Sequence, residues 1–267
     1  MCILFWTVDN HPKYRFIFAS NRDEFLKRPT ARAHFWDEPH QNVLAGIDLE
    51  FNSGDQQLKN GTWLGITRQG RFSALTNYRE QNFRGSISRG VLVRDFLWSS
   101  DSVHACLDNL YEHRNDYGGF NLIHFDFSKD PVEMAYLSNR ENQNRIDLKP
   151  GEIYGISNSV LNNPWTKVIE GKKLFENIIK KKPMTNVQDM QRIFDDLKER
   201  ICIPLFEFPE CPGVKDLSYA TRTSTIVLID YDNNVTFIER LWRDENDLTL
   251  FNPENYNDVI YHFKLEK

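Results

Sequence analysis

Directly after Met1 the sequence reads Cys2-Ile3-Leu4-Phe5-Trp6-Thr7-Val8, and a second apolar run at 15–20 leads straight into Asn21-Arg22-Asp23-Glu24. Both runs carry the β-branched and aromatic residues of buried strands, and Asn10-His11-Pro12 between them has turn chemistry. We therefore expect a hairpin of residues 2–8 and 14–20. The end of its second strand returns to the start of its first, so Asn21, Arg22 and Asp23 should lie close to Cys2.

Cys2 acquires a particular chemistry if Met1 is removed, which a small second residue permits. The chain then begins with a thiol and an α-amine on one residue, with pKa values near ~8.5 and ~7.7–8.0, so the amine can take the thiol proton at neutral pH. An arginine beside the thiol favours the thiolate, and an aspartate can accept from the amine and orient it. The alternative is a small buried cysteine beside a charged hairpin end whose surface ion pairs contribute little. These residues alone favour that alternative.

Composition limits the functional classes. The chain has 267 residues, of which 40% are hydrophobic and 13% aromatic, enough for a well-buried core. A net charge of −5, from 33 basic and 38 acidic residues, gives no electrostatic case for nucleic acid as a partner. Neither the glycine loop that cradles a phosphate nor an internal repeat is found in the sequence. The composition fits one large domain or two small ones.

The apolar start is too short and too acidic for a signal peptide or presequence, and no run approaches the ~20 apolar residues of a membrane span. We therefore expect a soluble, intracellular, cytoplasmic protein. In such a reducing compartment Cys2, Cys106, Cys202 and Cys211 are expected as thiols. Neither these cysteines nor the histidines have metal-ligand spacing, so no metal site is expected.

The remaining pattern alternates groups of strands with pairs of helices. Strands are expected near 43–47, 61–67 and 71–76, then at 119–126, 132–138 and 152–156, and finally at 223–231, 234–242 and 258–265, with an exposed loop at 48–60. Helices are expected at 89–99 and 101–114, from Asn163-Pro164 to about 181, and at 187–201 behind Asn186. Because the helices come in pairs, a parallel doubly wound sheet is disfavoured. Two antiparallel sheets with helices packed outside fit better.

Several short blocks, in order, resemble one known family. The first pair, Met1-Cys2-Ile3 and Ala19-Ser20-Asn21-Arg22-Asp23-Glu24, is similar to the NRDE family, also called the transport and Golgi organisation protein 2 family. Further blocks continue the match: Gly61-Thr62-Trp63-Leu64-Gly65, Ala74-Leu75-Thr76-Asn77-Tyr78-Arg79, Ser86 to Gly90, Gly118-Gly119-Phe120-Asn121-Leu122, Gly155-Ile156-Ser157-Asn158-Ser159, Pro164-Trp165 with Lys167-Val168, and Thr221-Arg222-Thr223-Ser224-Thr225. The resemblance therefore covers nearly the whole chain.

That family is in turn similar to N-terminal nucleophile hydrolases of the penicillin V acylase and bile salt hydrolase branch. The resemblance implies a single domain over residues 1–267 with a four-layer αββα sandwich, an α+β fold of two antiparallel sheets. It implies Cys2 as the nucleophile, with Arg22 and Asp23 beside it. Asn77 and Asn158 would be the asparagines that donate to the oxyanion and fix the amine, and Arg222 a second active-site arginine. The order Asn-Arg-Asp departs from the acylase pattern, in which an arginine precedes an asparagine, and this leaves the role of Arg22 less secure.

The resemblance leaves the function open between two classes. One is an amidase or thioesterase in which Cys2 attacks an amide or an acyl-CoA-like thioester, with no cofactor required. The other is a non-catalytic carrier that reuses the hydrolase pocket for haem, acyl-CoA or another lipid. The family is linked to Golgi organisation, protein secretion, haem trafficking out of mitochondria and lipid metabolism, so association with either organelle is implied by the family only. The sequence offers no Cys-x-x-Cys-His haem attachment, and it does not indicate the oligomeric state.

Overall fold

A computed structural model describes residues 2–50, 59–80, 87–142, 144–181, 189, 193, 195, 202–207, 218–243 and 257–266. The chain divides into two compact units, each of which is described by itself. Unit 1 comprises Met1–Arg28, Pro150–Ser157 and Leu161–Phe263, and unit 2 comprises Pro29–Lys149, Asn158–Val160 and Lys264–Lys267. The assignment of residues 1–267 to one domain stays a prediction.

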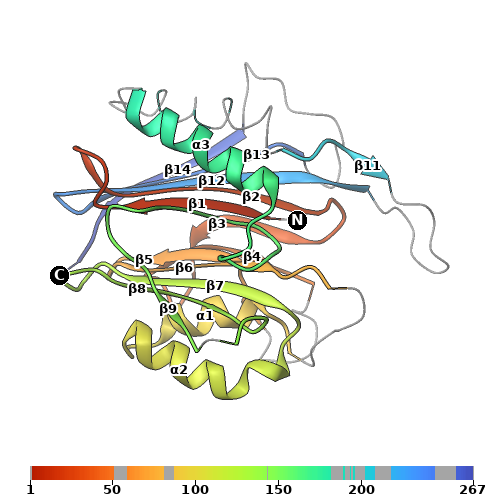
Figure 1. The fold of residues 1–267 in the computed structure, drawn as a ribbon, viewed down its shortest axis with the longest axis horizontal. Coiled ribbons are helices and arrows are strands. Elements are labelled where there is room, and N and C mark those ends of the chain that lie inside the picture. The colour runs from red at the N-terminus through yellow and green to blue at the C-terminus, as the bar shows by residue number, and fades with distance from the viewer. Residues whose placement is uncertain are drawn as a thin grey trace. The chain divides into compact units, whose positions relative to one another are not determined.

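Unit 1 is built on a sheet whose strand order is β10-β1-β2-β12-β13-β14, with β11 paired to β12 (Figure 1). The strands are β1 (Ile3–Val8), β2 (Tyr14–Phe25), β10 (Ile153–Ile156), β11 (Phe206–Glu207), β12 (Ser218–Asp230), β13 (Asn234–Leu241) and β14 (Asn257–Lys264). The pairs β1–β2, β1–β10, β2–β12 and β12–β13 are all antiparallel. The expected hairpin is therefore confirmed, and β2 continues five residues beyond it, through Asn21-Arg22-Asp23.

Helix α3 (Thr166–Lys181) covers one face of this sheet (Figure 1). Its apolar face, including Val168 and Phe175, shares a core with Ile3 and Phe5 of β1. Two glycines permit this close approach. A Cβ at position 171 would lie 2.4 Å from Cζ of Phe5, and one at position 155 would lie 2.9 Å from the same ring. The packing of α3 on β1 therefore depends on Gly155 and Gly171.

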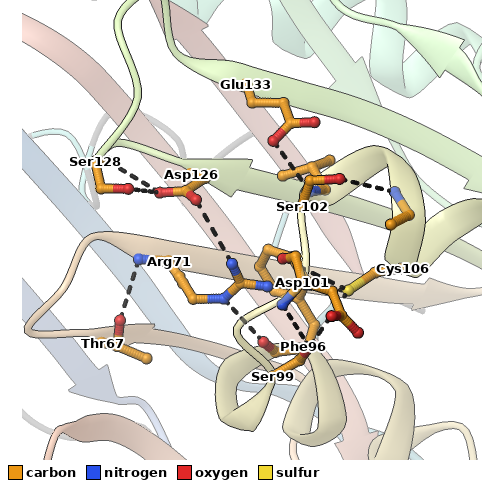
Figure 2. A network of polar contacts seen from close by, with 12 residues as sticks. Thr67, Arg71, Phe96, Ser99, Asp101, Ser102, Cys106, Asp126, Ser128 and Glu133 are labelled. Carbon is orange, nitrogen blue, oxygen red and sulfur yellow. Dashed lines mark hydrogen bonds and ion pairs between the residues drawn. The ribbon is translucent and has the colours of Figure 1, made fainter.

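Unit 2 is built on a second sheet, in the order β3-β4-β5-β6-β7-β8-β9, in which neighbouring strands are antiparallel. The strands are β3 (Thr30–Phe35), β4 (Val43–Asp48), β5 (Leu64–Thr67), β6 (Arg71–Asn77), β7 (Phe120–Asp126), β8 (Glu133–Ser138) and β9 (Ile146–Asp147). Helices α1 (Gly90–Trp98) and α2 (Val103–His113) pack on this sheet, and a short 3₁₀ helix follows at Arg114–Asp116. Their contact with the sheet includes a buried polar network around Arg71 (Figure 2).

Most expected elements are present, with local differences. The sequence pattern did not predict the strands β3, β9 and β11. Helix α3 begins at Thr166 rather than at Asn163-Pro164, because the Trp165 carbonyl accepts the first turn's N–H groups, from Val168 at 2.8 Å and Ile169 at 3.2 Å. The expected helix at 187–201 lies largely outside the described residues, as do most of the expected loop at 48–60 and Cys211. In the described part of the chain, no helix is long and apolar enough to cross a membrane.

Candidate active site around Cys2

Cys2 lies at the start of β1, between two antiparallel neighbours. Ile3 pairs with Asn21 of β2 and Leu4 pairs with Ile156 of β10, so the register brings Cys2 beside Arg22. The Ser157 hydroxyl donates to the Cys2 carbonyl at 2.7 Å. The backbone N–H of Asp23 donates to the Cys2 sulfur. The first residue of the hairpin is thus held from both sides, and its thiol lies against the segment Arg22-Asp23.

Asp23 is buried and is fixed by β12 rather than by its own strand. Its Oδ1 accepts from the Thr221 hydroxyl at 2.5 Å, and that hydroxyl itself accepts from the backbone N–H of Ile203 at 2.7 Å. The Tyr219 hydroxyl donates to the Asp23 carbonyl at 2.9 Å. Because Thr221 is bonded on both sides, the carboxylate has one defined orientation. Neither Thr221 nor Tyr219 was predicted as a site residue, although Thr221 opens one of the family blocks.

Burial dominates the electrostatics of the Cys2–Asp23 pair. It raises the pKa of the Cys2 thiol, an effect that the Asp23 charge reinforces while the chain's α-amino group and Arg22 oppose it. It also raises the pKa of Asp23 to about 6, against the positive charges of the α-amino group and Lys167 and the hydrogen bond from Thr221. Asp23 therefore titrates close to neutral pH, which is the range in which a group that exchanges or orients protons is useful.

Arg22 and Arg222 are both buried, but they have different partners. Arg22 forms an ion pair with Glu24, Nη2 to Oε2 at 3.6 Å, and its charge lowers the pKa of Cys2. Arg222 lies within β12, where the register shifts between Thr221 and Thr223, and not before the strand as the sequence predicted. Its Nη1 donates to the Arg28 carbonyl. The pairing of β12 with β2 is irregular at this point, a feature that the sequence pattern does not encode locally.

The Asn21 side chain bonds to residues outside β2, Ser224 and Cys202, and not to the Cys2 thiol. Its Oδ1 accepts from the Ser224 hydroxyl at 2.6 Å, and its Nδ2 lies 3.5 Å from the Cys202 sulfur. Trp242 donates to the same Ser224 hydroxyl at 2.7 Å. These bonds tie β2 to β12 directly beside Arg22.

Asn77 and Asn158 belong to unit 2, where they contact each other. The side-chain amide of Asn158 donates to the Asn77 carbonyl, and the Asn158 carbonyl accepts from the backbone N–H of Arg79 at 2.9 Å. Asn77 ends β6 and is exposed, while Asn158 is buried. Their predicted roles as oxyanion and amine ligands stay predictions.

Lys167 is a half-buried cation on the first turn of α3, and it interacts electrostatically with both Asp23 and Cys2. The sequence signal that contains it, Pro164-Trp165 with Lys167-Val168, was assigned to the family resemblance but to no site. Among the described residues, no group of three or more His, Cys, Asp or Glu side chains is placed to hold a metal ion.

The chain also matches known proteins over most of its length. A family model described as Transport and Golgi organisation 2 matches residues 1–244. The chain belongs to the transport and Golgi organisation 2 family. Among its relatives are the Transport and Golgi organization protein 2 homologs of Bos taurus, 33% identical with all of both chains covered, and of Homo sapiens, 34% identical over 97% of this chain and 99% of the relative. The Drosophila melanogaster protein is 30% identical over 90% of this chain and 91% of its own length.

Solved structures of two hydrolases share the fold. The C2A mutant of conjugated bile acid hydrolase from Clostridium perfringens has a TM-score of 0.54 and 10% identity, covering 100% of this chain and 97% of that one. The Caenorhabditis elegans ortholog of N-acylethanolamine-hydrolyzing acid amidase has a TM-score of 0.50 and 11% identity, covering 84% and 92%. The prediction of two antiparallel sheets with a fold like that of the N-terminal nucleophile hydrolases is thereby confirmed. At such identities this likeness concerns the fold and not the chemistry.

Proposed function

We propose that this family member is a Cys2-dependent acyl hydrolase that cleaves an amide or an acyl-CoA-like thioester. The observation that carries the proposal is the cluster at the start of β1, where the Cys2 thiol lies against the N–H of Asp23 and between charges of both signs. A shared hydrolase fold supports it, since the family of folds places a nucleophile on the first strand. An intracellular location, expected from the sequence, suits the chemistry because a reducing compartment keeps Cys2 as a thiol.

The mechanism begins with removal of Met1, which gives Cys2 a free α-amine. That amine takes the proton from the thiol, and the thiolate attacks the acyl carbonyl to form a carbon–sulfur bond. The bond to the amine or thiol leaving group then breaks, and the leaving group receives the proton from the α-amine. Water hydrolyses the acyl-Cys2 thioester and restores the thiol.

The charged neighbours have distinct parts in this scheme. Arg22 favours the thiolate, which opposes the effect of burial on the thiol. Asp23, oriented by Thr221, accepts from the α-amine and holds it toward the sulfur. Asn77 and Asn158 are the proposed oxyanion donors, each of which should contribute ~10²–10³ in rate if it acts in this way.

Intact-protein mass spectrometry, before and after incubation with a panel of acyl-CoAs, tests the proposal. The expected result is a chain that lacks Met1 and carries a transient acyl adduct confined to Cys2. A Cys2→Ala variant should lose the adduct and at least ~10³-fold of the turnover. Cys106→Ala is the matched control, because Cys106 is also a half-buried thiol but lies in unit 2, and it should keep both.

Blocking the N-terminus separates the proposed mechanism from its alternatives. A chain with an N-terminal extension that cannot be cleaved has no free amine on Cys2, so it should lose turnover while keeping its fold. Full activity in that chain would overturn the α-amine mechanism. Retained Met1 in native material with no adduct from any acyl-CoA would contradict the hydrolase itself, and haem titration would then test the non-catalytic carrier.

A further inference from the structure

Cys2 and Thr223 lie on the same face of the unit 1 sheet, the face that points away from α3. Ile3, which follows Cys2, belongs to the core that the sheet shares with α3. Ser224, which follows Thr223, accepts a hydrogen bond at 2.7 Å from Trp242, another residue of that core. Successive side chains of a strand point to opposite faces of a sheet. Because Ile3 and Ser224 face α3, Cys2 and Thr223 both face the other side.

The strand register sets these two residues in one row. Thr223 pairs with Arg22 across β12 and β2, and the register of β1 with β2 continues this row from Arg22 to Cys2. Since neighbouring strands lie about 4.8 Å apart, the row from Cys2 to Thr223 spans roughly 10 Å. A ligand that reacts with the Cys2 sulfur and lies across the strands therefore passes Arg22 and reaches Thr223.

The Thr223 hydroxyl is buried, and it has no hydrogen-bond partner among the described residues. Only 6% of the surface of Thr223 is exposed. The neighbouring hydroxyls on the other face differ, because Thr221 donates to Asp23 and Ser224 donates to Asn21. In the described part of the chain, no other buried hydroxyl lacks a partner. A hydroxyl in this state is uncommon, since burial removes its bonds to water and nothing within the protein replaces them.

Such a hydroxyl is suited to recognise a ligand. It can donate one hydrogen bond and accept others, so it pairs with a hydroxyl, a carbonyl or an amide. A site with a buried polar group discriminates against a ligand that leaves this group unpaired. Farther along the same face, Trp6, Phe18 and Val227 form an apolar row. The polar part of the face is thus at the end where Cys2 and Thr223 lie.

We propose that Thr223 is a binding residue of the Cys2 site, whose hydroxyl forms a hydrogen bond with a polar group of the ligand. That group, a hydroxyl, a carbonyl or an amide, lies roughly five to eight bonds from the carbon that the sulfur attacks. The site therefore prefers such a ligand to a plain hydrocarbon chain of the same length. For turnover this inference rests on the proposed acyl hydrolase, whereas the contact with a ligand at Cys2 does not.

Alkylation of Cys2 by paired chloroacetamides tests this without any turnover. One series carries a terminal hydroxyl on an N-alkyl chain of about two to six carbons, and the other ends in a methyl group at the same length. In each reaction the sulfur forms a bond to the methylene carbon, chloride leaves and the thiol proton goes to the buffer. The rate is read by mass spectrometry of the tryptic peptide that ends at Lys13. At one chain length the hydroxyl probe should react roughly fivefold faster than its pair, as expected for one hydrogen bond.

Variants at position 223 assign this preference to the hydroxyl. Thr223→Val replaces the hydroxyl by a methyl group of similar size and should abolish the preference, while Thr223→Ser should keep it. Thr225→Val is the matched control, because Thr225 is also buried and lies on the same strand and face. It should leave the preference unchanged. Both probes are measured on each variant, so a general change in thiol reactivity cancels in their ratio. If circular dichroism shows that Thr223→Val is misfolded, Thr223→Ala carries the same measurement.

Failure of the hydrolase and failure of this inference give different results. If no amide or thioester is turned over but Thr223→Val abolishes the probe preference, the proposed function is wrong and the role of Thr223 stands. If turnover is found, Thr223→Val should raise KM for a hydroxyacyl-CoA and leave KM for the plain acyl-CoA of the same length unchanged. A wild type without preference at any chain length, or a Thr223→Val variant that keeps the preference, overturns the inference.

Discussion

Each unit of the molecule buries an arginine with an aspartate, and the two pairs are bonded differently. In unit 2, Arg71 Nη1 lies 3.5 Å from Asp126 Oδ2, while Ser128 donates twice to Asp126 Oδ1 and Arg71 Nε donates to the Phe96 carbonyl at 3.1 Å (Figure 2). In unit 1, Arg22 pairs with Glu24 instead, and burial raises the pKa of Asp23 to about 6. The pair in unit 2 joins the neighbouring strands β6 and β7, and the Arg71 bond to Phe96 links them to α1. A carboxylate held close to its titration point is suited to chemistry.

The two regions should also respond to pH in opposite directions. Near Arg71, the Phe96 ring stacks on His124 with centroids 3.8 Å apart and lies 4.0 Å from the Arg71 guanidinium. Burial, reinforced by the charge of Arg71, lowers the pKa of His124 to about 3. A lowered histidine pKa makes unit 2 less stable in acid, whereas the raised pKa of Asp23 makes unit 1 less stable as the pH rises.

The largest expected effect comes from breaking the pair in unit 2. Arg71→Met leaves Asp126 buried without its cation, which typically costs about 3–5 kcal/mol of unfolding free energy. Hydrogen exchange of β6, β7 and α1 at pH 7 measures this loss, with Lys129→Met as an exposed control in the same unit. Cys2 alkylation should be unchanged. A loss below about 1 kcal/mol would mean that neither the ion pair nor the Arg71 bond to the Phe96 carbonyl holds this region, and that the two Ser128 bonds suffice for Asp126.

The comparison also shows what the sequence can predict. The hairpin followed from two apolar runs with a turn between them, and antiparallel register then put Arg22 and Asp23 beside Cys2. These are local rules, and they succeeded because the site begins at the first strand. Arg71 and His124 attracted no prediction, because their meaning depends on β6, β7 and α1 packing together.

Long-range packing accounts for what the sequence missed in the site itself. Helix α3 packs closely on β1 because Gly155 and Gly171 leave room for the Phe5 ring between them. Arg222 was expected before a strand, but β12 begins at Ser218 because its pairing with β2 extends to Tyr219. The spacing of residues near Cys2 predicts neither the packing of α3 on β1 nor the pairing of β12 with β2 around Arg222.

The next effect in size concerns Asp23. A raised folded-state pKa means that stability is fully present below the ordinary value of 3.8 and is lost as the pH rises through about 6. Asp23→Asn keeps an oxygen for Thr221 but does not titrate. Relative to the wild type, its unfolding free energy should therefore rise by about 3 kcal/mol between pH 3.5 and pH 8. Hydrogen exchange of β2 and β12 measures the difference at each pH.

The control for Asp23 lies on the same strand. Glu24→Gln removes a partly exposed carboxylate, and its difference from the wild type should vary much less with pH. Asp23→Asn should also lose turnover in spite of its greater stability, because the amide cannot hold the α-amine as the carboxylate does. If the difference in unfolding free energy between Asp23→Asn and the wild type did not change with pH, the Asp23 carboxylate would ionise without cost in the folded protein. Unit 1 would then lose no stability by holding Asp23 near its titration point.

The smallest expected effect concerns His124 in unit 2, where stability falls as the pH falls, opposite to the pH dependence that Asp23 gives unit 1. Because the folded pKa of His124 lies near 3 and its ordinary value is 6.5, stability is complete above 6.5 and declines as the pH falls toward 3. His124→Asn keeps a polar atom for the Ser73 hydroxyl, which lies 2.9 Å from Nδ1, but does not titrate. Between pH 6 and pH 4.5 the wild type should therefore lose about 2 kcal/mol relative to this variant. Hydrogen exchange of β6 and β7 gives this value, with His113→Asn, at an exposed position that ends α2, as the control. If hydrogen exchange of β2 and β12 showed the same loss of unfolding free energy as that of β6 and β7, the two units would unfold together. The opposite pH dependences of Asp23 and His124 would then add within one unfolding free energy instead of being measured separately for each unit.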